Sequence, residues 1–154
     1  MSLVLASTNP RLTFIRDIIV ATVVMVCLYG LALNVQFQWL QIPGYLLIVG
    51  FDVLEVTFGS AGANYYLLFA LYLMGLGILG ALLAHRLRER ASERALSWWR
   101  VGVASALAMV GVLSLLFALF VLIGTSQRTP VLITIATSLI LFALAGWLAG
   151  IGRK

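Results

Sequence analysis

Charged residues are scarce in this sequence. Asp, Glu, Lys and Arg make up 10% of the 154 residues, whereas hydrophobic residues make up 63%. An ordinary soluble domain contains about 25% charged residues, and a small domain buries only about two-thirds of the surface that its unfolded chain exposes. A soluble fold is therefore excluded, and we predict a single integral membrane domain over residues 1–154.

Cysteine and histidine are almost absent, since the chain has one of each, Cys27 and His85. A lone cysteine cannot form a disulfide within the chain, and the sequence has no Cys/His spacing typical of a metal site. One histidine cannot supply both axial ligands of a haem in a helical bundle. There is also no Ser/His/Asp grouping and no glycine-rich phosphate loop. We therefore expect no enzyme activity, no cofactor and no metal.

Long apolar runs dominate what remains. The hydrocarbon core of a bilayer requires about 20 apolar residues in a helix, and four runs meet this requirement without containing Asp, Glu, Lys, Arg or His. They cover residues 18–35, 65–84, 101–124 and 131–152. This pattern predicts an all-α integral membrane protein, built as a bundle of four transmembrane helices.

A fifth apolar run, at residues 42–58, carries the carboxylates of Asp52 and Glu55. Ten of its residues are Ile, Leu, Val or Phe, which together favour insertion by about 3–6 kcal/mol. An acidic residue at mid-membrane opposes insertion by about 2.5–3.5 kcal/mol. Because these contributions nearly cancel, hydropathy leaves open whether the segment crosses the membrane or lies at its outer face.

The basic residues indicate the topology. Five arginines lie within residues 85–100, which we predict to be a cytoplasmic loop under the positive-inside rule. With four spans, nine of the ten basic residues are cytoplasmic, whereas five spans also place Arg11 and Arg16 outside. We therefore favour a multi-pass protein of the cell membrane with both termini cytoplasmic and a re-entrant or interfacial segment at 42–58. Five transmembrane helices are the alternative.

Two further groups of residues relate to the bilayer and to helix packing. Trp39 and Tyr45 lie near the start of the 42–58 segment, and Trp98 and Trp99 precede the run at 101–124; we expect their amphipathic rings at the depth of the lipid headgroups. Small residues that recur along a membrane helix allow another helix to approach closely. Those that we expect to pack helices are Gly77, Gly80, Ala81, Ala84, Ala104, Ala108, Gly111, Gly146 and Gly150. The competing explanation is that Gly and Ala are simply common in membrane helices.

Asp52 and Glu55 are the candidate functional residues. Their spacing of three places them on one face of a helix, and ionisable residues within a membrane usually serve a function. Either residue is a candidate for contact with an ion, a proton or a partner protein. The competing explanation is a solvated pair at the outer surface.

These observations predict a small membrane protein without its own catalytic centre. We expect an accessory or structural subunit of a larger membrane complex, since the strong spans have almost no polar residues to line an aqueous path. Its partners would be the lipid bilayer and other membrane-protein subunits, or further copies of itself, and not nucleic acid. The alternative is a component of proton- or cation-coupled transport that uses Asp52 and Glu55.

Overall fold

The computed structural model describes residues 9–90, 97–124, 126 and 128–151, without the side chains of Arg90 and Trp98. Its elements are α1 (Pro10–Asn34), α2 (Gln38–Phe58), the short 3₁₀ helix η1 (Gly62–Asn64), α3 (Tyr65–Arg90), α4 (Trp98–Gly124) and α5 (Arg128–Leu148). The predicted all-α fold is confirmed for these residues. By length and composition each of the five α-helices could cross a membrane, so the chain is a multi-pass membrane protein.

The helices extend beyond the apolar runs that predicted them. α1 begins at Pro10 rather than near residue 18, and the side-chain oxygen of Asn9 caps it by accepting a hydrogen bond from the Arg11 amide, at 3.2 Å. α2 begins at Gln38 rather than at residue 42, and α3 continues from the predicted limit at 84 to Arg90. Polar residues such as Arg and Gln are good helix formers, which allows the helices to continue past the apolar part.

The last helix and the basic loop differ from their predicted limits in another way. α5 begins at Arg128 and ends at Leu148, whereas the apolar run covered 131–152. Residue 152 lies outside the described part of the chain, as do residues 91–96 of the predicted cytoplasmic loop 85–100. The described ends of that loop belong to the helices, because α3 runs to Arg90 and α4 begins at Trp98.

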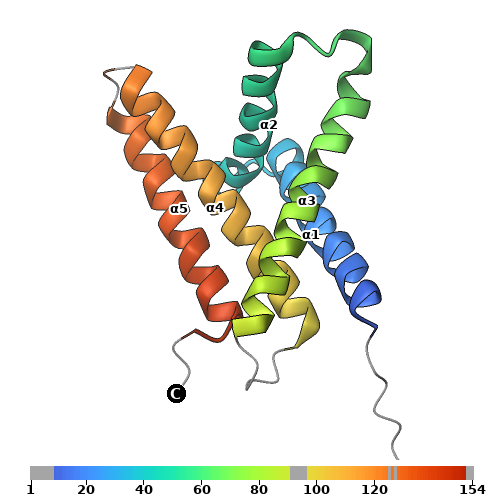
Figure 1. Ribbon diagram of the computed structural model, residues 1–154. Helices are drawn as coiled ribbons and strands as arrows, with labels where there is room; N and C mark the ends of the chain where they lie inside the picture. The colour runs from blue at the N-terminus through green and yellow to red at the C-terminus, as the bar shows by residue number, and fades with distance from the viewer. Residues whose placement is uncertain (1–8, 91–96, 125, 127, 152–154) are drawn as a thin grey trace, which may run out of the picture.

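α1 and α3 pack against each other in antiparallel directions (Figure 1). Asp17, near the start of α1, forms an ion pair with Arg88, near the end of α3. Tyr29, near the end of α1, packs against Phe69, near the start of α3, with ring centroids 4.9 Å apart. The last residue of α1 and the first residue of α3 therefore lie toward the same end of the pair.

α4 and α5 form a second antiparallel pair. The Ser114 hydroxyl of α4 donates a hydrogen bond to the Thr134 carbonyl oxygen of α5, at 2.6 Å. The Ser138 hydroxyl of α5 donates to the Gly111 carbonyl oxygen of α4, at 2.9 Å. α5 packs chiefly against α4 and lies at one edge of the bundle in Figure 1. Most of the surface of α5 is therefore not covered by the other described helices.

Charge separates the two ends of the bundle. The start of α1, the end of α3 and the start of α4 meet at one end, drawn lowest in Figure 1. We call this the basic end, and its described arginines are Arg11, Arg16, Arg86, Arg88 and Arg100. The other end, which we call the opposite end, has Asp52 and Glu55 near the end of α2 and Arg128 at the start of α5.

α2 connects the end of α1, which lies near mid-height in Figure 1, to the start of α3 at the opposite end. Residues 35–37 join it to α1, and residues 59–64 join it to α3. Gly44 of α2 packs so closely on α1 that an added methyl group would overlap the Leu28 carbonyl oxygen. Phe51 of α2 packs on Phe69 of α3. These contacts lie in the halves of α1 and α3 that are remote from the basic end.

The buried core joins all five helices. It contains Ala21 and Met25 of α1, Leu47 and Phe51 of α2, Phe69, Leu73 and Leu76 of α3, Ala106 and Val110 of α4, and Leu141 of α5. Many other large apolar side chains point outward, such as Phe120, which is 64% exposed, and Leu132, which is 67% exposed. Such an exposed apolar surface is compatible with contact with the lipid bilayer, as expected for helices that could cross a membrane.

Candidate binding site around the second helix

Asp52 and Glu55 have different surroundings although they share one side of α2. Asp52 is exposed. Glu55 is half-buried, and its Oε1 atom accepts a hydrogen bond from the Ala61 amide, at 2.7 Å. Gly59, with φ of +107°, ends α2 and returns the chain toward Glu55. Within the described residues, neither carboxylate forms an ion pair with a basic side chain.

An aromatic cluster lies beside Glu55 and joins three helices. Phe51 of α2 packs edge-on against Tyr65 and Phe69 of α3, with ring centroids 5.2 and 5.3 Å apart. Tyr72 of α3 packs on Phe51 at 5.6 Å, and Tyr29 of α1 adds the fifth ring through Phe69. Tilted and edge-to-face pairs of this kind stabilise aromatic packing. The cluster fixes the position of α2 relative to α3.

A cavity of about 310 Å³ lies between α2 and α3. We call it the α2–α3 cavity. Its walls include the rings of Phe51, Phe58 and Tyr72, the side chains of Leu54 and Leu68, and Glu55. Glu55 is the only carboxylate among the residues that line it, and no Lys, Arg or His is among them. The cavity therefore combines an aromatic surface with a single carboxylate.

The Tyr72 hydroxyl is buried and has no hydrogen-bond partner within the described residues. It lies directly against Gly50 of α2, where an added methyl group would meet the hydroxyl oxygen at 2.5 Å. A buried hydroxyl without a partner loses the hydrogen bonds that it makes with water. Gly50 is the residue that leaves room for this hydroxyl between the two helices.

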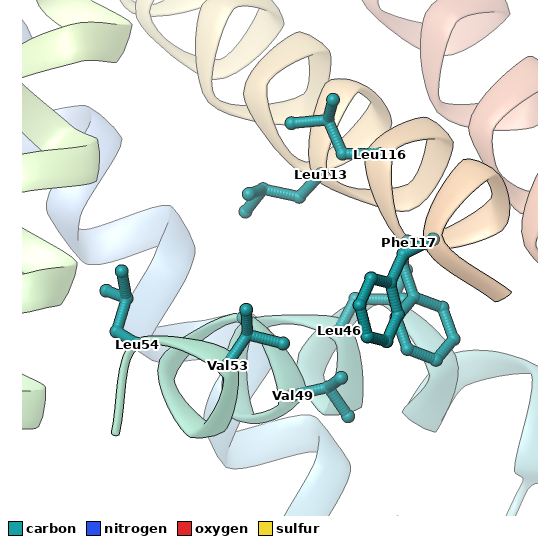
Figure 2. A pocket seen from close by; sticks show the side chains of 9 residues that line it. Leu46, Val49, Val53, Leu54, Leu113, Leu116 and Phe117 are labelled. Atoms are coloured by element: carbon teal, nitrogen blue, oxygen red, sulfur yellow. The ribbon is translucent and has the colours of Figure 1, made fainter. Parts of the chain in front are cut away.

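A second cavity, of about 350 Å³, lies on the other side of α2, between α2 and α4. Figure 2 shows side chains of both helices pointing into this space. They include Leu46, Val49 and Val53 from α2 and Leu113, Leu116 and Phe117 from α4. Every side chain in this wall is apolar, so this second cavity offers no group that could bind a charge or a hydrogen-bonding ligand.

Polar side chains within the packed helices mostly bond to backbone carbonyl oxygens. Ser105 donates to Gly102 within α4, at 2.8 Å, and Thr137 donates to Ile133 within α5, at 2.9 Å. The hydroxyls of Ser114 and Ser138 bridge α4 and α5. Such hydroxyls satisfy their hydrogen bonds inside the protein and do not line a polar path.

The structure places the predicted helix-packing residues in several surroundings. At Gly77, an added methyl group would overlap the Thr22 side chain. At Gly80 it would lie 3.2 Å from Ala21, and at Gly111 it would lie 3.0 Å from the ring of Phe142. Ala81, Ala84 and Ala104 are buried, and Ala108 is half-buried.

Two of the predicted packing residues lie elsewhere. Gly146 has open space where a side chain would be. Gly150 lies beyond the end of α5 with φ of +73°. Its positive φ, which favours glycine, accounts for this residue without reference to helix packing.

The predicted interfacial aromatic residues are exposed where the structure describes them. Trp39 is 62% exposed, Tyr45 is 47% exposed and Trp99 is 47% exposed. The side chain of Trp98 lies outside the described residues. Trp39 and Tyr45 belong to the first half of α2, which begins near mid-height of the bundle in Figure 1, whereas Trp99 belongs to the first turn of α4, at the basic end.

Sequence reasoning missed the ion pair between Asp17 and Arg88. Asp17 is 1% exposed, and the Nη2 atom of Arg88 donates to its Oδ1 atom at 2.8 Å, while Nη1 donates to Oδ2. The available signal was that Asp17 directly precedes the apolar run at 18–35, and that arginines directly follow the apolar run at 65–84. If those two helices are antiparallel neighbours, these residues meet.

Comparison of the chain with protein-family models, with curated proteins and with solved structures finds no match. Within the described residues there is also no group of three or more His, Cys, Asp and Glu side chains placed to hold a metal ion.

Proposed function

We propose that this protein is a non-catalytic subunit that assembles with other membrane proteins in the cell membrane. The observation that carries the proposal is the hydrogen bonding of the polar side chains at the helix contacts, such as Ser114 and Ser138, which is directed to backbone oxygens of the bundle itself. Such helices are built to pack on one another and on lipid, because their polar groups leave no aqueous path.

The topology that belongs to this proposal has four spans, α1, α3, α4 and α5, with both termini cytoplasmic. α2 would then lie at the outer face as a re-entrant or interfacial helix. Two observations support it. α2 connects two helix ends on the same side of the antiparallel α1–α3 pair, and all the described arginines except Arg128 lie at the basic end, as the positive-inside rule requires of the cytoplasmic side.

The surface best suited to a partner is the outward side of α5. This helix packs chiefly against α4, and Gly146 has no neighbour within 4 Å of an added methyl group. At Gly77 and Gly111 a neighbouring helix of the same chain occupies this space. Gly30 of α1 and Gly75 of α3, by contrast, face open space as Gly146 does. A small residue that faces open space on a membrane helix allows the close approach of another helix.

The experiment is to extract the protein from its native membrane in mild detergent and to measure the mass of the particle that contains it. We expect a particle that includes other membrane proteins. Gly146→Leu should release the protein from this particle without unfolding it, because an added β-carbon there has no atom of the other described helices within 4 Å. Leu132→Ala, a change at an exposed residue near the other end of α5, is the control. A stable monomer from native membranes would contradict the proposal.

A component of proton- or cation-coupled transport is the second candidate. The observation in its favour is that Glu55 lines a cavity without an ion-pair partner among the described residues. Purified protein in liposomes should then move protons or cations, and Glu55→Gln should abolish the flux. Flux that persists in both Glu55→Gln and Asp52→Asn would remove this candidate.

A further inference from the structure

We infer that the α2–α3 cavity binds an organic cation of the quaternary-ammonium class. In this arrangement Glu55 supplies the counter-charge, and Phe58 and Tyr72 supply most of the aromatic surface, because Phe51 belongs to the buried core. The inference goes beyond assembly with partner subunits and does not depend on it, because the cavity lies between α2 and α3 and the assembly surface lies on α5.

The charge of the site favours a cation. Glu55 lines the cavity, Asp52 lies one turn away on the same helix, and the cavity wall contains no basic residue. Arg128, the basic residue of the opposite end within the described chain, belongs to α5, which is not part of the wall. A half-buried carboxylate without an ion-pair partner gains stability when a cation enters beside it.

The hydrogen bonding of Glu55 leaves part of its carboxylate for such a ligand. Oε1 accepts from the Ala61 amide, and this bond holds the side chain at the cavity. A carboxylate accepts at two oxygens, and the second oxygen can face the ligand. The same hydrogen bond therefore orients the counter-charge and keeps it at a fixed place in the wall.

The lining selects among cations. Three rings and two leucines make up most of the named wall, and the faces of aromatic rings attract alkylammonium groups within about 6 Å. A calcium or magnesium ion requires about six or more oxygen ligands, which one carboxylate in an apolar wall does not supply. A quaternary ammonium fits better, because it carries a diffuse charge on an apolar surface and requires no hydrogen-bond acceptor.

The size of the cavity suits a small ligand. Ligand pockets typically occupy about 300–1,000 Å³, and this cavity, of about 310 Å³, is near the lower limit. The same chemistry has two natural sources, a free organic cation and the choline headgroup of a neighbouring phospholipid. Both would reach the cavity at the opposite end of the bundle, where α2 and α3 are joined.

The test measures binding of benzyltrimethylammonium to the full chain in detergent micelles, with empty micelles subtracted. Its neutral carbon isostere, neopentylbenzene, is measured in the same way. We expect the cation to bind at least about tenfold more tightly than the isostere, because only the cation gains from Glu55 and from the ring faces. Equal affinity of the two compounds, or no binding of the cation, would overturn the inference.

Two matched pairs of variants place the ligand. Glu55→Gln should weaken cation binding about tenfold while leaving the isostere unchanged, whereas Asp52→Asn removes the same charge from a residue outside the cavity wall and should change the affinity less than about threefold. Glutamine still accepts from the Ala61 amide, so the fold is retained. Tyr72→Phe should retain binding, and Tyr72→Leu should weaken it by loss of the ring.

Helicity and elution volume confirm that each variant is folded. Equal losses in Asp52→Asn and Glu55→Gln would also overturn the inference, because they would show attraction by the surface charge in general. Nanodiscs distinguish the two sources. Phosphatidylcholine should compete with the probe if its choline headgroup occupies the cavity, whereas phosphatidylglycerol, which has no choline, should not compete.

No competition by either lipid would indicate that the natural ligand of the cavity is a free organic cation.

Discussion

Asp17 and Arg88 show how a charged pair is accommodated at the basic end. The carboxylate is 1% exposed and accepts two hydrogen bonds from one guanidinium group, whose side chain is 26% exposed. Paired hydrogen bonds of this geometry are strong and directional. Removing Arg88 would leave the Asp17 carboxylate buried without its partner, and a buried unpaired charge costs more free energy than the intact pair contributes.

We predict that Asp17→Ala lowers the free energy of unfolding by about 1.5–3 kcal/mol, because Arg88 loses the carboxylate that accepts its two hydrogen bonds. Thermal unfolding of the detergent-solubilised protein measures the change, and a double-mutant cycle with Arg88→Ala should give less than the sum of the two single losses. His85→Ala is the control, since His85 and Glu89 form a pair at 3.4 Å that is 57% exposed on both sides. Such pairs contribute about 0–1 kcal/mol. Equal losses in Asp17→Ala and His85→Ala would contradict this account.

Two glycines should respond in opposite directions to the same substitution. Gly44→Ala places a methyl group on the Leu28 carbonyl oxygen, and overpacking of this kind costs about 1–3 kcal/mol. Gly146→Ala meets open space and should stabilise α5 by up to about 1 kcal/mol through helix propensity. The unfolding temperature of each variant in the same detergent tests the pair. A stabilising Gly44→Ala would show that α1 and α2 do not touch there.

The sequence predicted some of these residues and could not predict others. The spacing of Asp52 and Glu55 correctly implies one side of a helix, because the helical period fixes that relation. It does not imply that Glu55 bonds to the Ala61 amide, since that bond depends on how the chain turns at Gly59. Asp17 likewise required knowledge of which helix lies beside α1, which no local pattern contains.

At the scale of the element, α5 depends on one neighbour. It packs chiefly against α4, and hydroxyl groups bond across that contact in both directions. In lipid there is no hydrophobic drive to hold two helices together, so close packing and such hydrogen bonds hold them. The attachment of α5 should therefore be sensitive to the loss of these hydroxyls.

We predict that Ser114→Ala and Ser138→Ala each destabilise the α4–α5 contact by about 0.6 kcal/mol, a typical value for hydrogen bonds within membrane proteins. Combining them should speed amide hydrogen exchange in α5 and leave α3 unchanged. Ser105→Ala is the control, because Ser105 bonds to Gly102 in its own helix. Exchange in α5 that does not differ between the double variant and this control would exclude the proposed role of the hydroxyls.

α2 is the element on which the sequence left two alternatives open. Its composition allows a span, its two carboxylates oppose one, and Pro43 occurs within the helix. Insertion energies cannot separate the alternatives, because they depend on residue type and depth and not on neighbours. The antiparallel direction of α1 and α3 bears on the topology of α2, and it was not predictable from local sequence because it depends on contacts between residues far apart in the chain.

At the scale of the whole molecule, charge and topology support each other. The described arginines of α1, α3 and α4 share one end of the bundle, which no single helix determines. The count of basic residues in the sequence already favoured a cytoplasmic location for these segments. The distribution of basic residues does not predict assembly with other subunits, and neither does hydropathy, because lipid-facing and partner-facing surfaces of a membrane helix have similar composition.

A topology of four spans requires that α2 begins and ends on the same side of the membrane. It is tested most directly by single cysteines at Gln36, Ser60 and Ser7 in a Cys27→Ala background, labelled in intact cells by a reagent that does not cross membranes. This account predicts that Gln36→Cys and Ser60→Cys are both labelled from outside and that Ser7→Cys is protected. Labelling of Ser60→Cys and Ser7→Cys with protection of Gln36→Cys would show that α2 crosses the membrane, and would contradict it.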